Sequence, residues 1–150
     1  KKKELFENVE NMTIVTQSKW LKDIVDESFL RYHQTIVINN GIDTDVFSPR
    51  APEKSSFGIS EDKFVILGVA AQFTPRKGLK YFLEIADKLD ENNAIFLIGL
   101  NKKQLRSLPK NIIGIERTEN IEKLVEAYSI VDVFIISTLE DNLLTTGLTA

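Results

Sequence analysis

Two cations and a glycine stand together in residues 72–78, which read Gln-Phe-Thr-Pro-Arg-Lys-Gly. The pattern after Gly78 predicts a helix, so Arg76 and Lys77 precede a helix N-terminus, where exposed N–H groups and the helix dipole favour an anion. Either cation could add a charge-assisted hydrogen bond, which contributes roughly 1.5–3 kcal/mol. The segment is neither a Walker loop nor a G-x-G-x-x-G fingerprint. A solvated basic turn, in which Gly78 only relieves the backbone, fits the same residues.

A second polar segment follows the last apolar run of the chain. Glu140 and Asp141 come first, and Thr145, Thr146 and Gly147 follow. Carboxylates in this place could accept hydrogen bonds from sugar hydroxyls, and the later residues could offer N–H groups at a second helix start. An acidic surface turn fits the same pattern. Hydrolysis by paired carboxylates is disfavoured, because adjacent residues do not approach one bond from opposite sides.

The amino-acid composition excludes several kinds of catalytic and metal site. The chain has no Cys and one His, which excludes thiol catalysis, a disulfide framework and a His-rich metal site. A net charge of −3 and a pI of about 5.3 argue against nucleic acid as a partner. The longest apolar run, at 64–71, is far shorter than the roughly 20 residues that cross a bilayer. We therefore expect a cytoplasmic protein.

Short apolar or β-branched runs alternate with segments of helical period, which predicts βαβ units. The expected strands are 12–16, 35–38, 64–71, 94–98, 111–115 and 132–137. Two helices are expected to begin after the capping residues Ser18 and Asn120. Two more are expected at 79–89 and 102–107. The run at 64–71 is continuously apolar, as in a strand buried on both faces of a parallel sheet. We expect an α/β fold, a Rossmann-like parallel sheet with helices on both faces.

Such a sheet also predicts where a ligand binds. In open α/β sheets, ligands lie beyond the carboxyl ends of the strands, where the strand order reverses. If the four strands from residue 64 onward take the order 3-2-1-4, the loops 72–78 and 138–147 are neighbours. The two polar segments then form one site.

The residues before this sheet carry one βαβ pattern and then an aperiodic stretch. Trp20 lies beside Leu21 and Ile24 on the first helical segment, and we expect it in the core. Between Gly41 and Ser60 no strand or helix period is present, and prolines stand among charged residues. We interpret this stretch as a linker or a long crossing loop.

Several motifs in this order closely resemble retaining glycosyltransferases of the GT-B type. The first are Thr-Gln-Ser-Lys-Trp-Leu at 16–21 and Asn-Gly-Ile-Asp at 40–43 with Phe-Ser-Pro at 47–49. The match continues through Arg-Lys-Gly at 76–78, Ile-Gly at 98–99, Asp-Val-Phe at 132–134 and Thr-Leu-Glu-Asp-Asn at 138–142. The resemblance implies glycosyl transfer from a UDP- or GDP-sugar, with retention of anomeric configuration and no metal cofactor.

Site residues follow from the resemblance, motif by motif. Lys77 matches the family lysine that holds the donor diphosphate, where it would neutralise charge on the departing phosphate. The family's preceding arginine falls on Gln72, so one cation is missing, and Arg76 is the candidate to replace it. The first of two family glutamates falls on Asp141, which we expect to hold the donor sugar as the catalytic carboxylate. The second falls on Thr149, which lacks a carboxylate for the ribose. The N–H groups near Thr145, Thr146 and Gly147 would bind a phosphate.

The extent of the resemblance predicts a partial enzyme. Residues 1–48 resemble the C-terminal end of an acceptor domain with the interdomain hinge, and residues 49–150 the N-terminal half of a donor-binding domain. We expect the fragment to be inactive alone and to self-associate through the exposed sheet edge at 134–136. The full-length enzyme would use a glycan or lipid-linked acceptor in polysaccharide or glycoconjugate synthesis, peripheral at the membrane. The alternative is a non-catalytic binding or assembly module derived from such an enzyme, which Gln72 and Thr149 favour.

Overall fold

The computed structural model describes residues 2–118 and 120–139. The described residues form two compact units, residues 2–41 and 42–139. No helix in the described ranges is long and apolar enough to cross a membrane.

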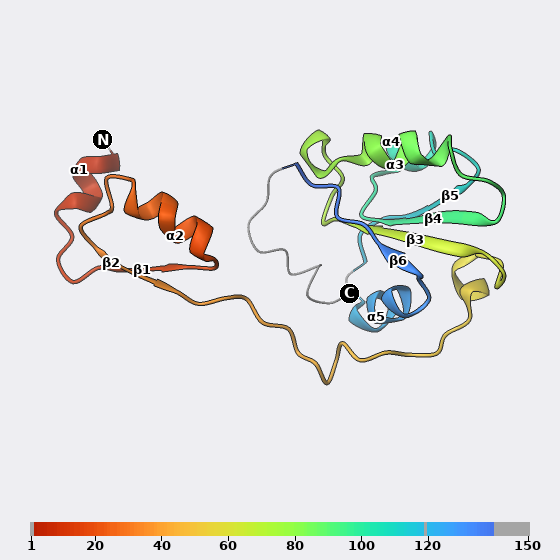
Figure 1. Ribbon diagram of the computed structural model, residues 1–150, viewed down its shortest axis with the longest axis horizontal. Coiled ribbons are helices and arrows are strands. Elements are labelled where there is room, and N and C mark those ends of the chain that lie inside the picture. The colour runs from red at the N-terminus through yellow and green to blue at the C-terminus, as the bar shows by residue number, and fades with distance from the viewer. Residues whose placement is uncertain (1, 119, 140–150) are drawn as a thin grey trace. The chain divides into compact units, whose positions relative to one another are not determined.

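The first unit is a single βαβ motif with a short helix before it (Figure 1). Its elements are α1 (Lys2–Glu7), β1 (Thr13–Thr16), α2 (Lys19–Asp26) and β2 (Gln34–Val37). The two strands pair in parallel, from Thr13 opposite Gln34 to Thr16 opposite Val37. Ser18 caps α2 as predicted, because its Oγ accepts a hydrogen bond from the Leu21 N–H at 3.2 Å. The prediction for Trp20 is wrong: its side chain is 59% exposed.

The second unit is built on a four-stranded parallel sheet in the order β5-β4-β3-β6. Counted from residue 64, this is the predicted order 3-2-1-4. The strands are β3 (Phe64–Val69), β4 (Asn93–Ile98), β5 (Ile112–Ile115) and β6 (Val133–Phe134). The helices between them are α3 (Leu79–Ala86), α4 (Lys102–Leu105) and α5 (Ile121–Ser129), with two short 3₁₀ turns, η1 (Lys54–Phe57) and η2 (Pro75–Lys77).

Helices cover both faces of this sheet, which confirms the predicted fold class. Figure 1 shows α3 and α4 on one side of the sheet and α5 on the other. Alternate residues of each strand enter different cores, as a pleated strand requires. Ile66 and Ile95 pack with Phe82 of α3, whereas Leu67 and Phe96 belong to the core that α5 completes. The central strands are therefore apolar on both faces, as their continuous apolar sequences predict.

The edge of the sheet at β6 is shorter than predicted. The apolar run at 132–137 suggested a full strand, but only Val133 and Phe134 pair with β3. The amides of Asp132 and Ile135 still donate to the carbonyls of Val65 and Leu67. Val133 is 41% exposed, since no other described strand pairs with the outer side of β6.

The aperiodic stretch between the units is anchored to the second unit from Arg50 onward. The Arg50 N–H donates to Ser129 Oγ at 2.9 Å. Lys54 Nζ donates to the Lys63 carbonyl at 2.7 Å and lies 3.4 Å from the Asp132 carboxylate. Two apolar side chains then enter the core: the Phe57 ring lies 5.2 Å from that of Phe96, and Ile59 is 2% exposed. The sequence predicted a loop here, without these anchors.

The chain turns sharply where β4 ends, and the turn requires a glycine. Gly99 has a φ of +106°, and a Cβ atom there would overlap the carbonyl oxygen of Ala70. Its own N–H donates to the Ile115 carbonyl at 3.1 Å, so the backbone is held in place from the other side as well. This close approach brings the carboxyl ends of β3, β4 and β5 together.

We expect Gly99→Ala to lower the free energy of unfolding by about 3 kcal/mol or more, since a disfavoured φ alone costs about 1–3 kcal/mol. The matched control is Gly58→Ala, because Gly58 has a similarly left-handed φ of +73° but nothing within 4 Å of the added Cβ. Urea unfolding of both variants measures the difference. A loss for Gly99→Ala no larger than that for Gly58→Ala would contradict the close approach to Ala70.

Candidate functional site

The basic segment 72–78 connects β3 to α3 at the carboxyl end of the sheet. Phe73 anchors its start: the ring is 3% exposed and meets Phe82 edge-on at a centroid distance of 5.9 Å. The 3₁₀ turn η2 follows, with the Lys77 N–H donating to the Thr74 carbonyl at 2.9 Å. Gly78 ends this turn in the left-handed conformation, with a φ of +72°, and α3 begins directly after it. Arg76 and Lys77 are thereby fixed next to the first turn of a helix.

The residues that follow β6 contact this segment directly. Ser137 Oγ donates to the Lys77 carbonyl at 2.8 Å, and the Leu139 N–H donates to the Arg76 carbonyl at 3.1 Å. A Cβ atom on Gly78 would overlap the Ser137 carbonyl oxygen. The structure thus brings together the first predicted loop and the start of the second, as the predicted strand order requires.

This meeting point is where the strand order reverses. The chain leaves β3 toward β4 and β5, crosses the sheet through α5, and returns to β6 on the other side of β3. Reversals of this kind open a crevice beyond the carboxyl ends of the strands, which is where α/β sheets bind ligands.

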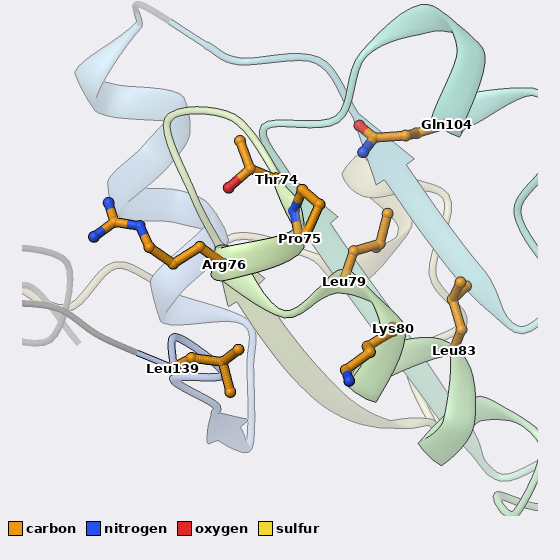
Figure 2. A pocket seen from close by; sticks show the side chains of 8 residues that line it. All are labelled: Thr74, Pro75, Arg76, Leu79, Lys80, Leu83, Gln104 and Leu139. Carbon is orange, nitrogen blue, oxygen red and sulfur yellow. The ribbon is translucent and has the colours of Figure 1, made fainter.

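One hollow lies on the α3 side of the segment (Figure 2). It has a volume of about 670 Å³. Leu79 and Leu83 of α3 form part of its wall with Leu139, and Arg76 and Lys80 supply positive charge. Thr74, Pro75 and Gln104 complete the lining. The hollow combines an apolar wall with two cations, and one of these is the predicted Arg76.

A second hollow, of about 410 Å³, lies at the carboxyl ends of β3, β4 and β5. Gln72 lines it together with seven other residues, of which only Gly99 belongs to a motif of the family resemblance. These are Ala71, Gly99, Leu100, Asn101, Lys102, Glu116 and Arg117. Lys102 and Arg117 place two cations beside one carboxylate, Glu116. Their position directly after predicted strands was the signal that could have identified them.

The structure therefore divides the predicted donor-binding residues between two places. Gln72 lines the smaller hollow and Arg76 the larger one, while Lys77 lines neither of these two. All three belong to one short segment at the reversal of strand order. The assigned roles of these residues stay predictions. Asp141, Thr145, Thr146 and Gly147 lie outside the described residues, as does Thr149.

The arrangement suits the binding of an anion. The loops and first helical turns that follow β3 and β4 carry cations, among them Arg76, Lys77, Lys80 and Lys102. The N-terminus of α3 adds the partial positive charge of the helix dipole.

Comparison with known proteins finds similarity both in sequence and in structure. No family model matches the chain. The chain is 24% identical over 112 residues to processive diacylglycerol alpha-glucosyltransferase from Acholeplasma laidlawii, covering 67% of this chain and 33% of that protein. Its structure matches sucrose-phosphate synthase from Thermosynechococcus elongatus with a TM-score of 0.79 at 16% identity, over 99% of this chain and 40% of that one.

The first match is named as a glucosyltransferase, which agrees with the resemblance of this sequence to GT-B-type glycosyltransferases. The structural match covers both units of the chain and confirms the fold. The chain spans about a third of the curated relative and less than half of the solved one. The chain is thus similar in sequence to a glucosyltransferase, and its fold resembles that of sucrose-phosphate synthase.

Proposed function

We propose that the protein transfers a sugar from a nucleotide-sugar donor to an acceptor, with retention of anomeric configuration. The observation that carries this proposal is the joining of the basic segment 72–78 to the residues after β6 at the reversal of strand order. A diphosphate with an attached sugar is a ligand that such a position and such charges can hold.

In this proposal the charges near α3 stabilise the leaving group. When the bond between the sugar and the diphosphate breaks, negative charge grows on the departing phosphate oxygen. In this role the Lys77 ammonium and the Arg76 guanidinium lie near that oxygen and lower the energy of this state. The smaller hollow, lined by Gln72 and Arg117, is the place for the nucleoside, because it lies beyond the same strand ends. Asp141 would accept hydroxyls of the donor sugar.

The acceptor in the whole protein is a glycan or a lipid-linked molecule. The name of the matched relative, a diacylglycerol glucosyltransferase, favours a lipid acceptor. We propose that the whole protein works in glycoconjugate or polysaccharide synthesis on the cytoplasmic side of a membrane, held at its surface. Positioning of both substrates supplies roughly 7–11 kcal/mol of barrier reduction, so transfer requires an acceptor cleft as well as the donor site.

Calorimetric titration of the chain with UDP and with GDP tests the donor site. Affinity near the micromolar range for either nucleotide supports the proposal, and the preferred nucleotide identifies the donor class. The absence of binding to both would contradict a working donor site and favour the alternative of a binding or assembly module. Gln72, a neutral amide in the smaller hollow, is the residue that favours this alternative.

We expect Lys77→Ala to weaken nucleotide binding roughly tenfold or more, the equivalent of one charge-assisted hydrogen bond. Lys88→Ala is the matched control, because it removes the same charge from an exposed position beyond the other end of α3. Titration of both variants with the nucleotide that the native chain prefers measures the effect. Equal affinity of the two variants would remove the role assigned to Lys77.

We expect the chain to self-associate through β6. Val133 and Ile136 are 41% and 49% exposed along this edge, and a sheet edge with exposed apolar side chains pairs readily with another strand. Replacing Val133 with Lys should shift the chain toward monomer, since edge lysines oppose such pairing. Size-exclusion chromatography with light scattering gives the mass of both forms. A native chain that elutes as a well-folded monomer would contradict this expectation.

A further inference from the structure

Contacts at both ends fix the segment that carries Arg76 and Lys77 on the sheet. Between Phe73 and α3 it contains only the 3₁₀ turn η2, whose internal hydrogen bonds set its shape but not its orientation on the sheet. Its orientation depends on contacts at its two ends. Ser137 and Leu139 bind the far end, at the carbonyls of Lys77 and Arg76.

Phe73 fixes the near end, and both of its backbone polar groups are bound by the connection between β4 and α4. Its N–H donates to the Gly99 carbonyl at 3.0 Å. Its carbonyl accepts a hydrogen bond from Gln104 Nε2 at 2.9 Å. Of these two hydrogen bonds, only the one from Gln104 is made by a side chain. It joins α4 to a residue 31 positions earlier in the chain.

Gln104 also caps α4, but this second role uses only the Oε1 atom of its side-chain amide. Its Oε1 accepts from the Asn101 N–H at 2.9 Å, while Asn101 Oδ1 accepts from the Gln104 N–H at 2.9 Å, which together form a capping box at the start of α4. A glutamate would complete this capping box as well. The amide NH₂ group is needed only for the bond to Phe73, because a carboxylate would place an acceptor against the Phe73 carbonyl.

The hydrogen bond from Gln104 to the Phe73 carbonyl is partly buried beside the larger hollow. Gln104 is half-buried and lines the same hollow as Arg76 (Figure 2). Part-buried hydrogen bonds to a backbone carbonyl hold more firmly than exposed ones, since water competes less.

We propose that Gln104 is a positioning residue of the donor site: its amide holds the Phe73 carbonyl and thereby orients the segment with Arg76 and Lys77. This role rests on the proposed function, because the donor diphosphate is the ligand that the oriented cations would meet. Gln104 itself does not touch the reacting atoms in this proposal.

Two variants separate the positioning role from helix capping. Gln104→Glu keeps the acceptor for Asn101 and removes the donor to Phe73, whereas Gln104→Met removes both. Lys103→Gln is the matched control, because it changes the net charge by the same amount as Gln104→Glu from an exposed neighbouring position. Amide hydrogen exchange measured by NMR reports on Phe73, Lys77 and Gly78 in the segment and on Asn101 at the cap.

In Gln104→Glu we expect exchange at Phe73, Lys77 and Gly78 to rise about two- to tenfold, the equivalent of one hydrogen bond. Asn101 should keep its protection in this variant and lose it in Gln104→Met. The amide of Ile130, at the end of α5, should not change in Gln104→Glu, which distinguishes local loosening from a general loss of stability. Affinity for the nucleotide that the native chain binds should fall by a similar factor, and Lys103→Gln should change neither measurement.

Unchanged exchange in the segment would overturn the proposal, and so would faster exchange with unaltered nucleotide affinity. An equal rise at Ile130 would also overturn it, because Gln104 would then serve only general stability. If the native chain binds neither UDP nor GDP, the proposed function fails and the donor-positioning role fails with it. The exchange data still decide in that case whether Gln104 holds the segment.

Discussion

The parallel pairing of β3 with a strand on each side determines where this chain can do chemistry. Phe64–Val69 is hydrogen-bonded to β4 along one edge and to β6 along the other, and its side chains enter apolar cores on both faces. A polar side chain in such a strand would be buried without water, which costs free energy unless it finds a partner. Polar chemistry is therefore restricted to the strand ends, and the short segment after β3 carries the cations.

The same pairing explains why residues far apart in sequence meet at the site. Since all strands of this sheet run in one direction, their carboxyl ends share one edge, and the segments that leave them are neighbours. Ser137 contacts Lys77 although some 60 residues separate them, and Gln104 contacts Phe73 across 31. Side chains and carbonyls at this edge satisfy each other's hydrogen bonds, so the site is a connected network that extends from α4 to the residues after β6.

Much of the fold could be predicted because the apolar runs are long. The run at 64–71 and its neighbours indicated buried parallel strands, and Ser18 and Asn120 indicated helix starts, which both residues cap. Features without a period were missed: α1, the anchor Phe57 and the buried Ile59 stand among charges, prolines and glycine. The prediction that Trp20 lies in the core failed for a different reason. A helical pattern identifies the apolar face of a helix but does not show whether another element covers that face.

The site was predictable in its location and less so in its details. The loop 72–78 followed from the carboxyl-end rule, and its meeting with Ser137 followed from strand order. That Gln72 and Arg76 line different hollows did not follow, because neighbouring side chains in a turn diverge in ways that spacing does not encode. Lys102 and Arg117 were not singled out, although both follow strands at the same edge.

The attachment of Arg50 to Ser129 and of Lys54 to Asp132 has a consequence for how the gene tolerates change. Upstream of these tethers, a residue added or lost between Gly41 and Pro49 leaves both contacts in place. Downstream of them, a single deletion would draw Phe57 or Ile59 out of the core and shift β3 against both of its partners. Length variation among natural and engineered relatives should therefore accumulate before residue 50 and stop there.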